Sequence, residues 1–152
     1  MTEDVAPNDQ LIAVVGYSST GKSASLRNIE NQDRWVYLNC ESGKRLPFKN
    51  KFNRITITDP MEIHAYFQEA IENRDDVDGI IVDSLTFLME MYESQYVLRS
   101  TNTMKSWGDY QQYFKTLMQE LVPQFGKPVI FTAHVKDETD EKTLDIRTFI
   151  PV

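Results

Sequence analysis

Two glycines, a lysine and a serine lie close together near the start of the chain. The stretch GYSSTGKS fits the pattern G-x-x-x-x-G-K-[ST] through Gly16, Gly21, Lys22 and Ser23. Glycines at these positions let the backbone curl so that consecutive N–H groups point at phosphate oxygens. An apolar run precedes the stretch and a helical pattern follows it, which is the context that the motif requires. The spacing therefore predicts a phosphate-binding loop.

The same loop gives roles to individual side chains. We expect Lys22 to reach the β- and γ-phosphates of ATP and the Ser23 hydroxyl to ligate Mg²⁺. A helix that begins near Lys22 adds the partial positive charge of its N-terminus to the phosphate site. The residues expected to contact the nucleotide are Gly16, Tyr17, Ser18, Ser19, Thr20, Gly21, Lys22, Ser23 and Ala24. ATP and Mg²⁺ are therefore the predicted cofactors.

A second residue that binds Mg²⁺, besides Ser23, is predicted at Asp83, which ends the apolar run GIIVD. A buried strand delivers its last residue to the carboxyl edge of the sheet, where a phosphate loop binds its ligand. Asp83 can instead cap the helix that follows, a role that Ser84 or Thr86 also fits. Together with the phosphate loop, the position favours Mg²⁺ binding by Asp83.

The carboxylate that activates water is predicted away from Asp83, because Ser84 occupies the position directly after it. Glu41, just past the apolar run at 34–39, is the nearest substitute. Parallel strands would bring this run to the same edge as Asp83, so we expect Glu41 to polarise the attacking water. The alternative is a glutamate that only faces solvent.

A hydrogen-bonding residue is also predicted beside the γ-phosphate, at the end of the apolar run 128–134. Thr132 or His134 would emerge there, where a polar side chain can distinguish ATP from ADP. His134 is the candidate for this sensing role. Its alternative is a structural role, which is common for a histidine at a strand end.

Strands and helices have to position these residues, and apolar runs alternate with helical patterns along the chain. The runs, each predicted as a strand, lie at 11–16, 34–39, 54–58, 79–83 and 128–134. The helical patterns lie at 22–29, at 86–98, at 109–122, and after a capping box that Asp59 and Glu62 form around Pro60. This alternation implies parallel pairing and a three-layer α/β sandwich with a mostly parallel central sheet. The terminal stretch TLDIRTFIPV predicts either an edge strand or the front part of a longer protein.

Length and composition predict one soluble domain over residues 1–152, with a flexible segment at 1–9. Cys40 is the only cysteine, which excludes an intrachain disulfide and favours a cytoplasmic location. No apolar run is long enough to cross a membrane, and the acidic start MTEDVAPNDQ does not resemble a secretion signal. A membrane partner is therefore not expected.

Charge is distributed unevenly along the chain. The net charge of −7 argues against broad electrostatic coating of nucleic acid. The stretch GKRLPFKNKFNR nevertheless contains no acidic residue. Its basic residues are Lys44, Arg45, Lys49, Lys51 and Arg54. This run is either a local binding surface or a solvated loop.

Several stretches of the chain together resemble the RecA-type ATPases, and most closely the compact phage members that act as ATP-dependent single-strand annealing or recombination proteins. In order, they are GYSSTGKS, LNCESGKRL, GIIVDS, NTMKSWGDY and FTAHVK. The resemblance implies a core sheet in the order 5-1-4-3-2, Glu41 as the hydrolytic residue, and His134 in place of the usual glutamine sensor. It also implies single-stranded DNA contacts from the loop after the fourth strand's helix and from the loop after the fifth strand. If the protein is phage-encoded, it would act in the host cytoplasm.

The DNA contacts are predicted at specific residues. The segment RSTNTMKSWGDY is rich in small polar residues and contains Gly108, so we expect a mobile loop. Basic side chains there can follow a phosphate backbone, and an indole can stack on an unpaired base. The predicted DNA-contact residues are Arg99, Lys105, Trp107 and Lys136. The alternative for Trp107 is that it anchors the following helix to the core.

Three functions remain open, and the first is favoured. It is an ATP-binding and hydrolysing RecA-like protein that acts on single-stranded DNA in recombination, annealing or replication, alone, by self-association or with partner proteins. The second is an ATP-dependent accessory switch that works through a partner protein. The third is a small-molecule phosphotransferase, which usually needs several arginines around the transferred phosphoryl group, whereas the arginines here are few and scattered.

Overall fold

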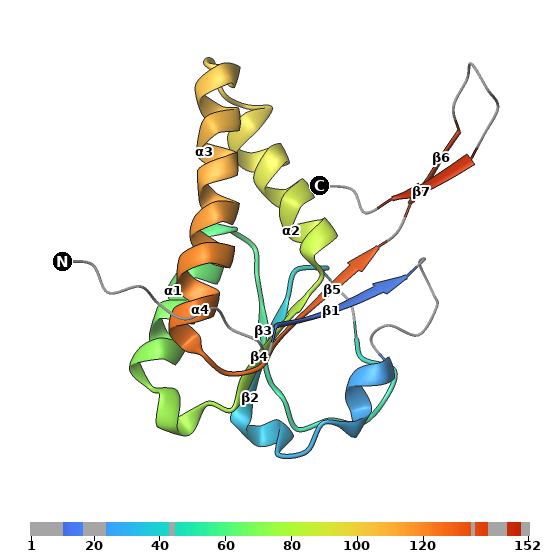
Figure 1. Cartoon of the computed structure of the whole chain (residues 1–152), viewed down its shortest axis with the longest axis vertical. Helices are drawn as coiled ribbons and strands as arrows, with labels where there is room; N and C mark the ends of the chain where they lie inside the picture. Colours follow the sequence, from blue (N-terminus) through green and yellow to red (C-terminus); the bar gives the residue numbers. More distant parts are fainter. Residues whose placement is uncertain (1–10, 17–23, 43–44, 135, 140–145, 150–152) are drawn as a thin grey trace.

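A parallel five-stranded sheet forms the centre of the molecule. The computed structural model describes residues 11–16, 24–42, 45–134, 136–139 and 146–149. The strands lie in the order β1-β5-β4-β2-β3 (Figure 1), and all pairs are parallel. Their bounds are β1 Leu11–Gly16, β2 Trp35–Asn39, β3 Asn53–Thr56, β4 Gly79–Asp83 and β5 Val129–His134. The predicted α/β class and each predicted strand are confirmed, with bounds shifted by at most two residues.

The strand order differs from the expected 5-1-4-3-2, and burial explains the difference. The expected order would place the 34–39 and 128–134 strands at the two edges and the 11–16 strand inside. In the structure, β1 and β3 are the edges. β2 is buried except at Val36 and β5 except at His134, whereas most residues of β1 and β3 are exposed. A parallel strand that buries both faces has to lie inside the sheet, so β2 and β5 take the interior positions.

Helices cover one face of the sheet and enclose the larger core. They are α1 Met61–Glu72, α2 Leu85–Tyr92, α3 Thr103–Thr116 and α4 Val122–Phe125. A π-helical turn at Glu93–Val97 extends α2, and a second at Leu117–Leu121 joins α3 to α4. Phe67 and Phe125 meet edge to face in this core, with ring centroids 6.4 Å apart. The helices at 86–98 and 109–122 are thus confirmed, the second with an earlier start.

The start of α1 follows the prediction. The Asp59 carboxylate accepts a hydrogen bond from the Met61 N–H at 3.0 Å, and the Glu62 carboxylate accepts one from the Asp59 N–H at 3.1 Å. These bonds satisfy donors that the beginning of a helix otherwise leaves unpaired. The Tyr96 hydroxyl also donates to Asp59 at 2.8 Å and ties α1 to the end of the α2 segment. The predicted capping box is confirmed.

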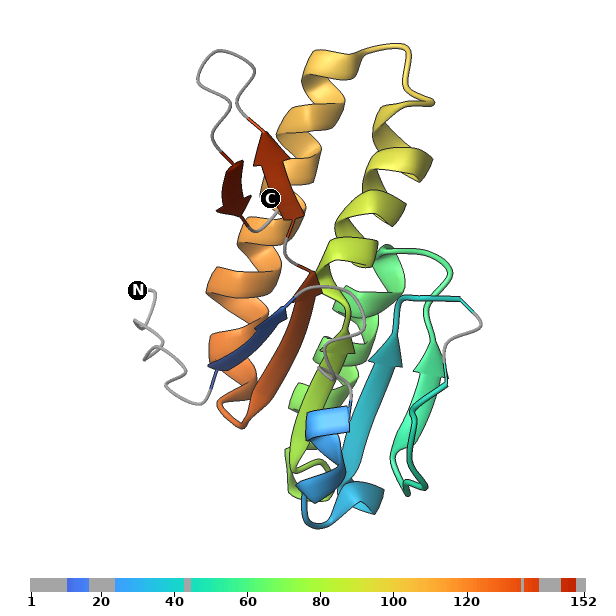
Figure 2. The same ribbon diagram turned by 90° about the vertical axis from the view of Figure 1, so that its right-hand side faces the viewer.

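A thinner layer covers the other face of the sheet. It consists of the 3₁₀ helix η1, Ala24–Asn28, and the chain before β3 (Figure 2). The core under this layer is formed by Leu26, Trp35, Tyr37, Phe52, Ile81 and Ile130. Gly79 is required here, because a Cβ at that position would lie 2.5 Å from the Trp35 ring. The three predicted layers are present, with most of the helical cover on one side.

α2 and α3 form a hairpin that projects beyond the carboxyl edge of the sheet (Figure 1, Figure 2). α3 begins at Thr103, where the Asn102 side chain accepts a hydrogen bond from the Lys105 N–H at 3.1 Å. The prediction of a mobile loop is therefore wrong for most of RSTNTMKSWGDY. Gly108 lies inside the helix but is not required by space, because a Cβ there would meet nothing within 4 Å. Glycine costs only about 1 kcal/mol relative to alanine at such a position.

The last described residues form a separate two-stranded sheet. β6 Lys136–Thr139 and β7 Ile146–Phe149 pair antiparallel. The strand predicted near the end of the sequence is thus present, and it pairs with β6 rather than with an edge of the main sheet. Short 3₁₀ helices lie at Gln32–Arg34 and Arg74–Asp76. Within the described ranges, no helix is both long enough and apolar enough to cross a membrane.

Candidate active site

Polar side chains gather where β2, β4 and β5 end, on the face that carries the smaller core. Tyr37, Ile81 and Ile130 belong to that core. Successive side chains of a strand point to opposite faces, so residues two or four positions farther along share the face. The polar residues placed there by this alternation are Asn39, Asp83, Thr132 and His134. The sheet therefore brings the ends of three strands to one corner, on the side of η1.

Asp83 lies in this corner and is held by two hydroxyl groups. It is 1% exposed. The Tyr37 hydroxyl donates a hydrogen bond to Oδ2 of Asp83, and the Thr132 hydroxyl donates one to Oδ1 at 2.6 Å. Two donors stabilise a buried carboxylate and fix its orientation. Each oxygen also has a second lone pair with which it can bind a metal ion.

Tyr37 is a site residue that the sequence analysis did not find. Burial raises the pKa of Tyr37 far above its usual value, and the negative charge of Asp83 raises it further. The phenol therefore keeps its proton and remains a hydrogen-bond donor at physiological pH. Tyr37 is in register with Ile81, two residues before Asp83 on the neighbouring strand. A long side chain spans this diagonal, so strand register could have revealed the contact.

Ser84 caps the helix that follows Asp83. Its Oγ accepts a hydrogen bond from the Phe87 N–H at 3.4 Å. Of the predicted capping residues, Ser84 therefore takes the role. The Thr86 hydroxyl instead accepts a hydrogen bond from the His134 N–H at 3.0 Å, which links α2 to the end of β5.

The carboxylate at this corner suits Mg²⁺ bound together with nucleotide phosphates. Mg²⁺ prefers oxygen ligands in octahedral geometry and is usually held by one or two carboxylates, with phosphate and water oxygens completing the shell. Over the ranges that the structure describes, no group of three or more His, Cys, Asp or Glu side chains could hold a metal ion. A single oriented carboxylate, Asp83, meets the requirement of a nucleotide-bound Mg²⁺. Metal binding by Ser23 and Asp83 stays a prediction.

Glu41 follows β2 and is half-buried. Its N–H donates to Oδ1 of Asn39 at 3.1 Å, so the chain turns at the end of the strand. Burial is the main cause of the raised pKa of Tyr37, and the charges of Asp83 and, more weakly, Glu41 add to it. Both carboxylates therefore lie within electrostatic range of the same hydroxyl. The action of Glu41 on water stays a prediction.

The two sensing candidates on β5 have different surroundings. Thr132 is fully buried, and the single proton of its hydroxyl is donated to Asp83. His134 is half-buried, lies in register with Gly16, and meets the Phe87 ring edge to face at 5.4 Å. The geometry favours His134 of the two, since it lies beside the strand end from which the predicted phosphate loop begins.

Most of the predicted phosphate loop lies outside the described residues. This part contains Tyr17, Ser18, Ser19, Thr20, Gly21, Lys22 and Ser23, and Lys44 and the segment 1–9 lie outside them as well. The flanks of the loop are described, because Gly16 ends β1 and Ala24 begins η1. A strand before the loop and a helical segment after it are the context that the motif requires.

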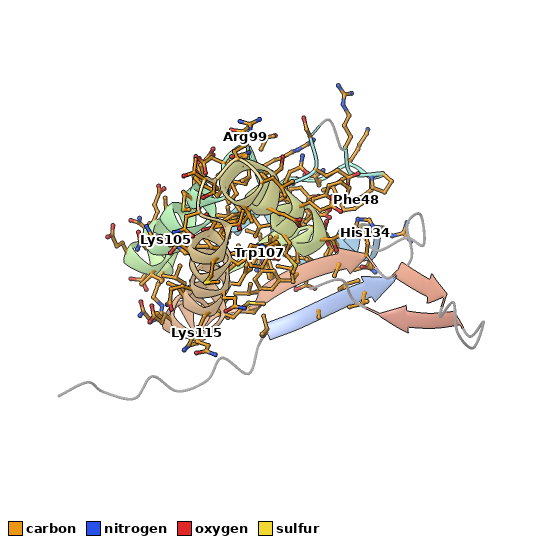
Figure 3. All side chains as sticks on the ribbon, turned by 90° about the horizontal axis from the view of Figure 1, so that it is seen from above. Phe48, Arg99, Lys105, Trp107, Lys115 and His134 are labelled. Carbon is orange, nitrogen blue, oxygen red and sulfur yellow. The ribbon has the colours of Figure 1, made fainter. Side chains whose placement is uncertain are left out.

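The predicted DNA-contact residues lie on other elements, away from Asp83. Arg99 and Lys105 lie near the tip of the α2–α3 hairpin, and the backbone of Lys136 begins β6. Lys105 and Trp107 are two residues apart on α3, so about 200° separates them around the helix axis. Figure 3 shows these two side chains on opposite sides of the helix. The structure therefore does not bring Lys105 and Trp107 onto one surface.

The Trp107 side chain is neither fully exposed to solvent nor buried in the core. It is 42% exposed, and its ring meets Tyr110 edge to face with centroids 5.3 Å apart. Leu98 and Met104 are 70% and 86% exposed in the same part of the hairpin. The sequence pattern does not single out these two residues, because isolated apolar residues in a polar segment give no periodic signal.

The described basic residues of this run are exposed to solvent. This holds for Arg45, Lys49, Lys51 and Arg54. Lys49 and Lys51 line a shallow cavity of about 510 Å³ together with Asn31 and Asp33. This cavity lies beside the amino ends of β2 and β3, at the opposite end of the strands from Asp83. This position separates Lys49 and Lys51 from the corner around Asp83, whereas Arg54 lies in register with Tyr37 on the neighbouring strand.

A comparison with known protein families gives a match over most of the chain. A family model described as an AAA domain matches residues 8–151, whereas no curated protein sequence matches the chain. Domains of this kind are P-loop ATPases that generally use ATP and Mg²⁺, so the predicted ATPase class is confirmed. The narrower likeness to phage single-strand annealing proteins stays a prediction. Because the match covers nearly the whole sequence, the chain belongs to the AAA domain family of P-loop ATPases.

Proposed function

We propose that the chain hydrolyses ATP with Mg²⁺ and uses this activity to act on single-stranded DNA in recombination, annealing or replication. The observation that carries the ATPase part is the buried Asp83 carboxylate, held by Tyr37 and Thr132 at the carboxyl edge of a parallel sheet. Ligands of open α/β sheets bind outside this edge. A carboxylate that is shielded from water and oriented there suits a Mg²⁺ ion on nucleotide phosphates.

A few side chains each have a role in ATP hydrolysis. Lys22 offsets the charge of the β- and γ-phosphates. Ser23 and Asp83 would hold Mg²⁺, which would neutralise charge on the phosphate oxygens. Glu41 orients a water molecule and accepts its proton as the water oxygen attacks the γ-phosphorus. The bond from the γ-phosphorus to the bridging oxygen breaks, and ADP leaves with that oxygen. His134 donates a hydrogen bond to the γ-phosphate, so the site responds to ATP and not to ADP.

The DNA part of the proposal rests on the α2–α3 hairpin, which projects from the same edge of the sheet as Asp83 (Figure 1). Arg99 and Lys105 supply positive charge for a phosphate backbone. The exposed fraction of Trp107, 42%, leaves part of the indole for stacking on an unpaired base. A strand that uses both Lys105 and Trp107 has to contact two sides of α3.

Two short connections link the ATP site with these DNA-contact residues. α2 begins at Leu85, two residues after Asp83, and leads to the tip of the hairpin. Lys136 follows His134 by two residues along the chain. A change at either strand end is therefore carried directly into an element proposed to contact DNA.

Two of the described arginines, Arg34 and Arg74, lie away from the edge of the sheet where a transferred phosphoryl group would bind. Arg34 pairs with Asp78 at 3.0 Å, before the first residues of β2 and β4. Arg74 packs beside Gly126, before β5 begins. Both guanidinium groups thus lie at the amino ends of the strands, whereas the transferred phosphoryl group would lie at the carboxyl ends.

ATP turnover measured with and without single-stranded DNA tests both parts of the proposal. We expect phosphate release by the wild-type chain with Mg²⁺ to rise when single-stranded DNA is added, and to be lost in Lys22→Ala. Turnover that DNA does not change, with no salt-sensitive DNA binding, would favour the accessory switch. Transfer of the phosphoryl group to a small molecule would favour the phosphotransferase. A folded wild-type protein that neither binds nor hydrolyses ATP would overturn the proposal.

A further inference from the structure

Asn39, the last residue of β2, carries a buried amide that is only partly used. It is 0% exposed. Oδ1 of its side chain accepts the hydrogen bond from the Glu41 N–H at 3.1 Å. Nδ2, at the other end of the amide, has no hydrogen-bond partner among the residues that the structure describes. A buried N–H group without an acceptor destabilises a fold, so such a group calls for an acceptor from another source.

The bond to Glu41 also fixes which way the Asn39 amide points. A backbone N–H can be satisfied only by an acceptor, and Oδ1 is the acceptor end of the side chain. The NH₂ group is therefore turned away from the chain at Glu41. Because Asn39 takes part in this turn through Oδ1 alone, its donor end serves no contact within the turn.

Asn39 faces the corner that contains Asp83. The two residues are in register on neighbouring strands, and both lie on the face of the smaller core. β2 is separated from β1 by β5 and β4, so the Asn39 end of the sheet is about 14 Å from the strand that leads to the predicted phosphate loop. A nucleotide whose Mg²⁺ is held by Asp83 has its terminal phosphates at the end of β4, next to the Asn39 end of β2.

We propose that Nδ2 of Asn39 donates a hydrogen bond to a γ-phosphate oxygen of bound ATP. This inference rests on the proposed ATPase function and adds a residue to it. A phosphate oxygen is a strong, charged acceptor that can satisfy a buried amide donor. The same oxygens carry the charge of the transition state, so a donor aimed at them stabilises hydrolysis as well as binding. ADP lacks this phosphate, and Asn39 therefore helps the site to distinguish the two nucleotides.

Two substitutions of Asn39 remove its NH₂ donor and keep an acceptor for the Glu41 N–H. In Asn39→Ser, the hydroxyl can still accept a hydrogen bond from the Glu41 N–H in the same kind of turn, but it is too short to reach the phosphate as well. In Asn39→Asp, the shape and the acceptor remain, while the NH₂ group is replaced by an oxygen that repels phosphate. Asn50 provides a matched control, because its Oδ1 accepts a hydrogen bond from the Phe52 N–H at 3.3 Å while Asn50 itself is exposed.

Dissociation constants for ADP and for a non-hydrolysable ATP analogue, measured by calorimetry with Mg²⁺, test the proposal. We expect Asn39→Ser to weaken binding of the ATP analogue about tenfold or more, the loss typical of a hydrogen bond to a charged group. ADP binding should change less than about twofold, by the same principle, because no contact is lost. Asn39→Asp should weaken the ATP analogue further, and Asn50→Ser and Asn50→Asp should change neither nucleotide. Because the substitution removes an unsatisfied donor, nucleotide-free Asn39→Ser should melt at or above the temperature of the wild type.

The possible failures point to different conclusions. Equal weakening of ADP and the ATP analogue, or no weakening of either, would overturn the role of Asn39 while leaving the ATPase proposal intact. Loss of folding in both Asn39 variants would show a structural role and would also overturn it. A wild-type protein that binds neither nucleotide would instead contradict the proposed function itself.

Discussion

The corner around Asp83 and the tip of the α2–α3 hairpin are both polar, and they are built in opposite ways. At the corner, Asp83 is 1% exposed and accepts hydrogen bonds from Tyr37 and Thr132, two side chains on neighbouring strands. At the tip, Met104 is 86% exposed, and the Asn102 side chain accepts its hydrogen bond from the backbone that begins α3. One region is fixed by the sheet, whereas the other presents side chains to solvent.

This difference suits two kinds of task. Phosphate chemistry needs groups held to within about 0.5 Å of the productive geometry, which buried and hydrogen-bonded side chains provide. Contact with a single strand needs charge and stacking area, which exposed side chains supply without fixed geometry. Substitutions at the corner should therefore change rates by orders of magnitude, and those at the tip should change affinity by smaller factors.

The largest effect is expected from Lys22→Ala. Removing the ammonium group that faces the β- and γ-phosphates should abolish ATP turnover, while the melting temperature stays that of the wild type because the predicted contacts are with the ligand. Turnover is measured by phosphate release and folding by circular dichroism. A folded variant with normal turnover would show that the GYSSTGKS stretch does not bind phosphate.

Glu41→Gln should separate binding from hydrolysis. The amide keeps the size of the side chain but cannot accept a proton, so turnover should fall by about 10²-fold or more while ATP affinity persists. Glu90→Gln, at an exposed position of α2, is the matched control and should keep full turnover. If Glu41→Gln stays within a few-fold of the wild type, the group that activates water lies elsewhere.

Thr132→Val measures how much the hydrogen bond from Thr132 to Asp83 contributes to the stability of the fold. The variant keeps the shape of the side chain but removes a donor from the buried Asp83, so the free energy of unfolding should fall by about 1–3 kcal/mol. Thr103→Val, at an exposed position at the start of α3, should change it by less than about 0.5 kcal/mol. Urea denaturation gives both values. Equal effects at the two sites would remove the contrast between corner and tip.

The smallest effects are expected at the tip. Lys105→Ala should reduce the salt dependence of single-strand binding by a slope of about one without lowering the melting temperature. Trp107→Ala should weaken that binding by about 1–3 kcal/mol if its indole stacks on a base. Fluorescence anisotropy at several salt concentrations measures both. A destabilised Trp107→Ala protein beside an indifferent Lys105→Ala protein would instead identify Trp107 as an anchor for α3.

The parts of the corner that could be predicted are those that depend on local patterns. The run GIIVD is buried at every position, so its length and apolar character alone placed Asp83 at a strand end. The strand order could not be predicted in this way, because it depends on which strands find cover on both faces. Tyr37 was missed for a related reason, since its partner Asp83 lies on another strand and only the register of β2 and β4 brings them together.

The tip was harder to predict because its local signals conflict. Gly108 and several small polar residues favour a loop, yet Asn102 supplies a helix cap and the following residues form α3. Glycine weakens a helix by only about 1 kcal/mol, and packing of Tyr113 in the larger core outweighs that cost. A polar segment between two helical patterns therefore does not by itself predict a loop. The absence of a helix-capping residue would be stronger evidence.

The dependence of ATP turnover on Mg²⁺ in Asp83→Asn tests the central claim most directly. Asn has the shape of Asp but lacks the charge that binds the metal ion, so a folded Asp83→Asn protein should lose turnover at every Mg²⁺ concentration. Asp109→Asn, at an exposed position of α3, removes the same charge and should keep the wild-type dependence. An Asp83→Asn protein whose turnover and Mg²⁺ dependence match the wild type would contradict a catalytic corner built around Asp83.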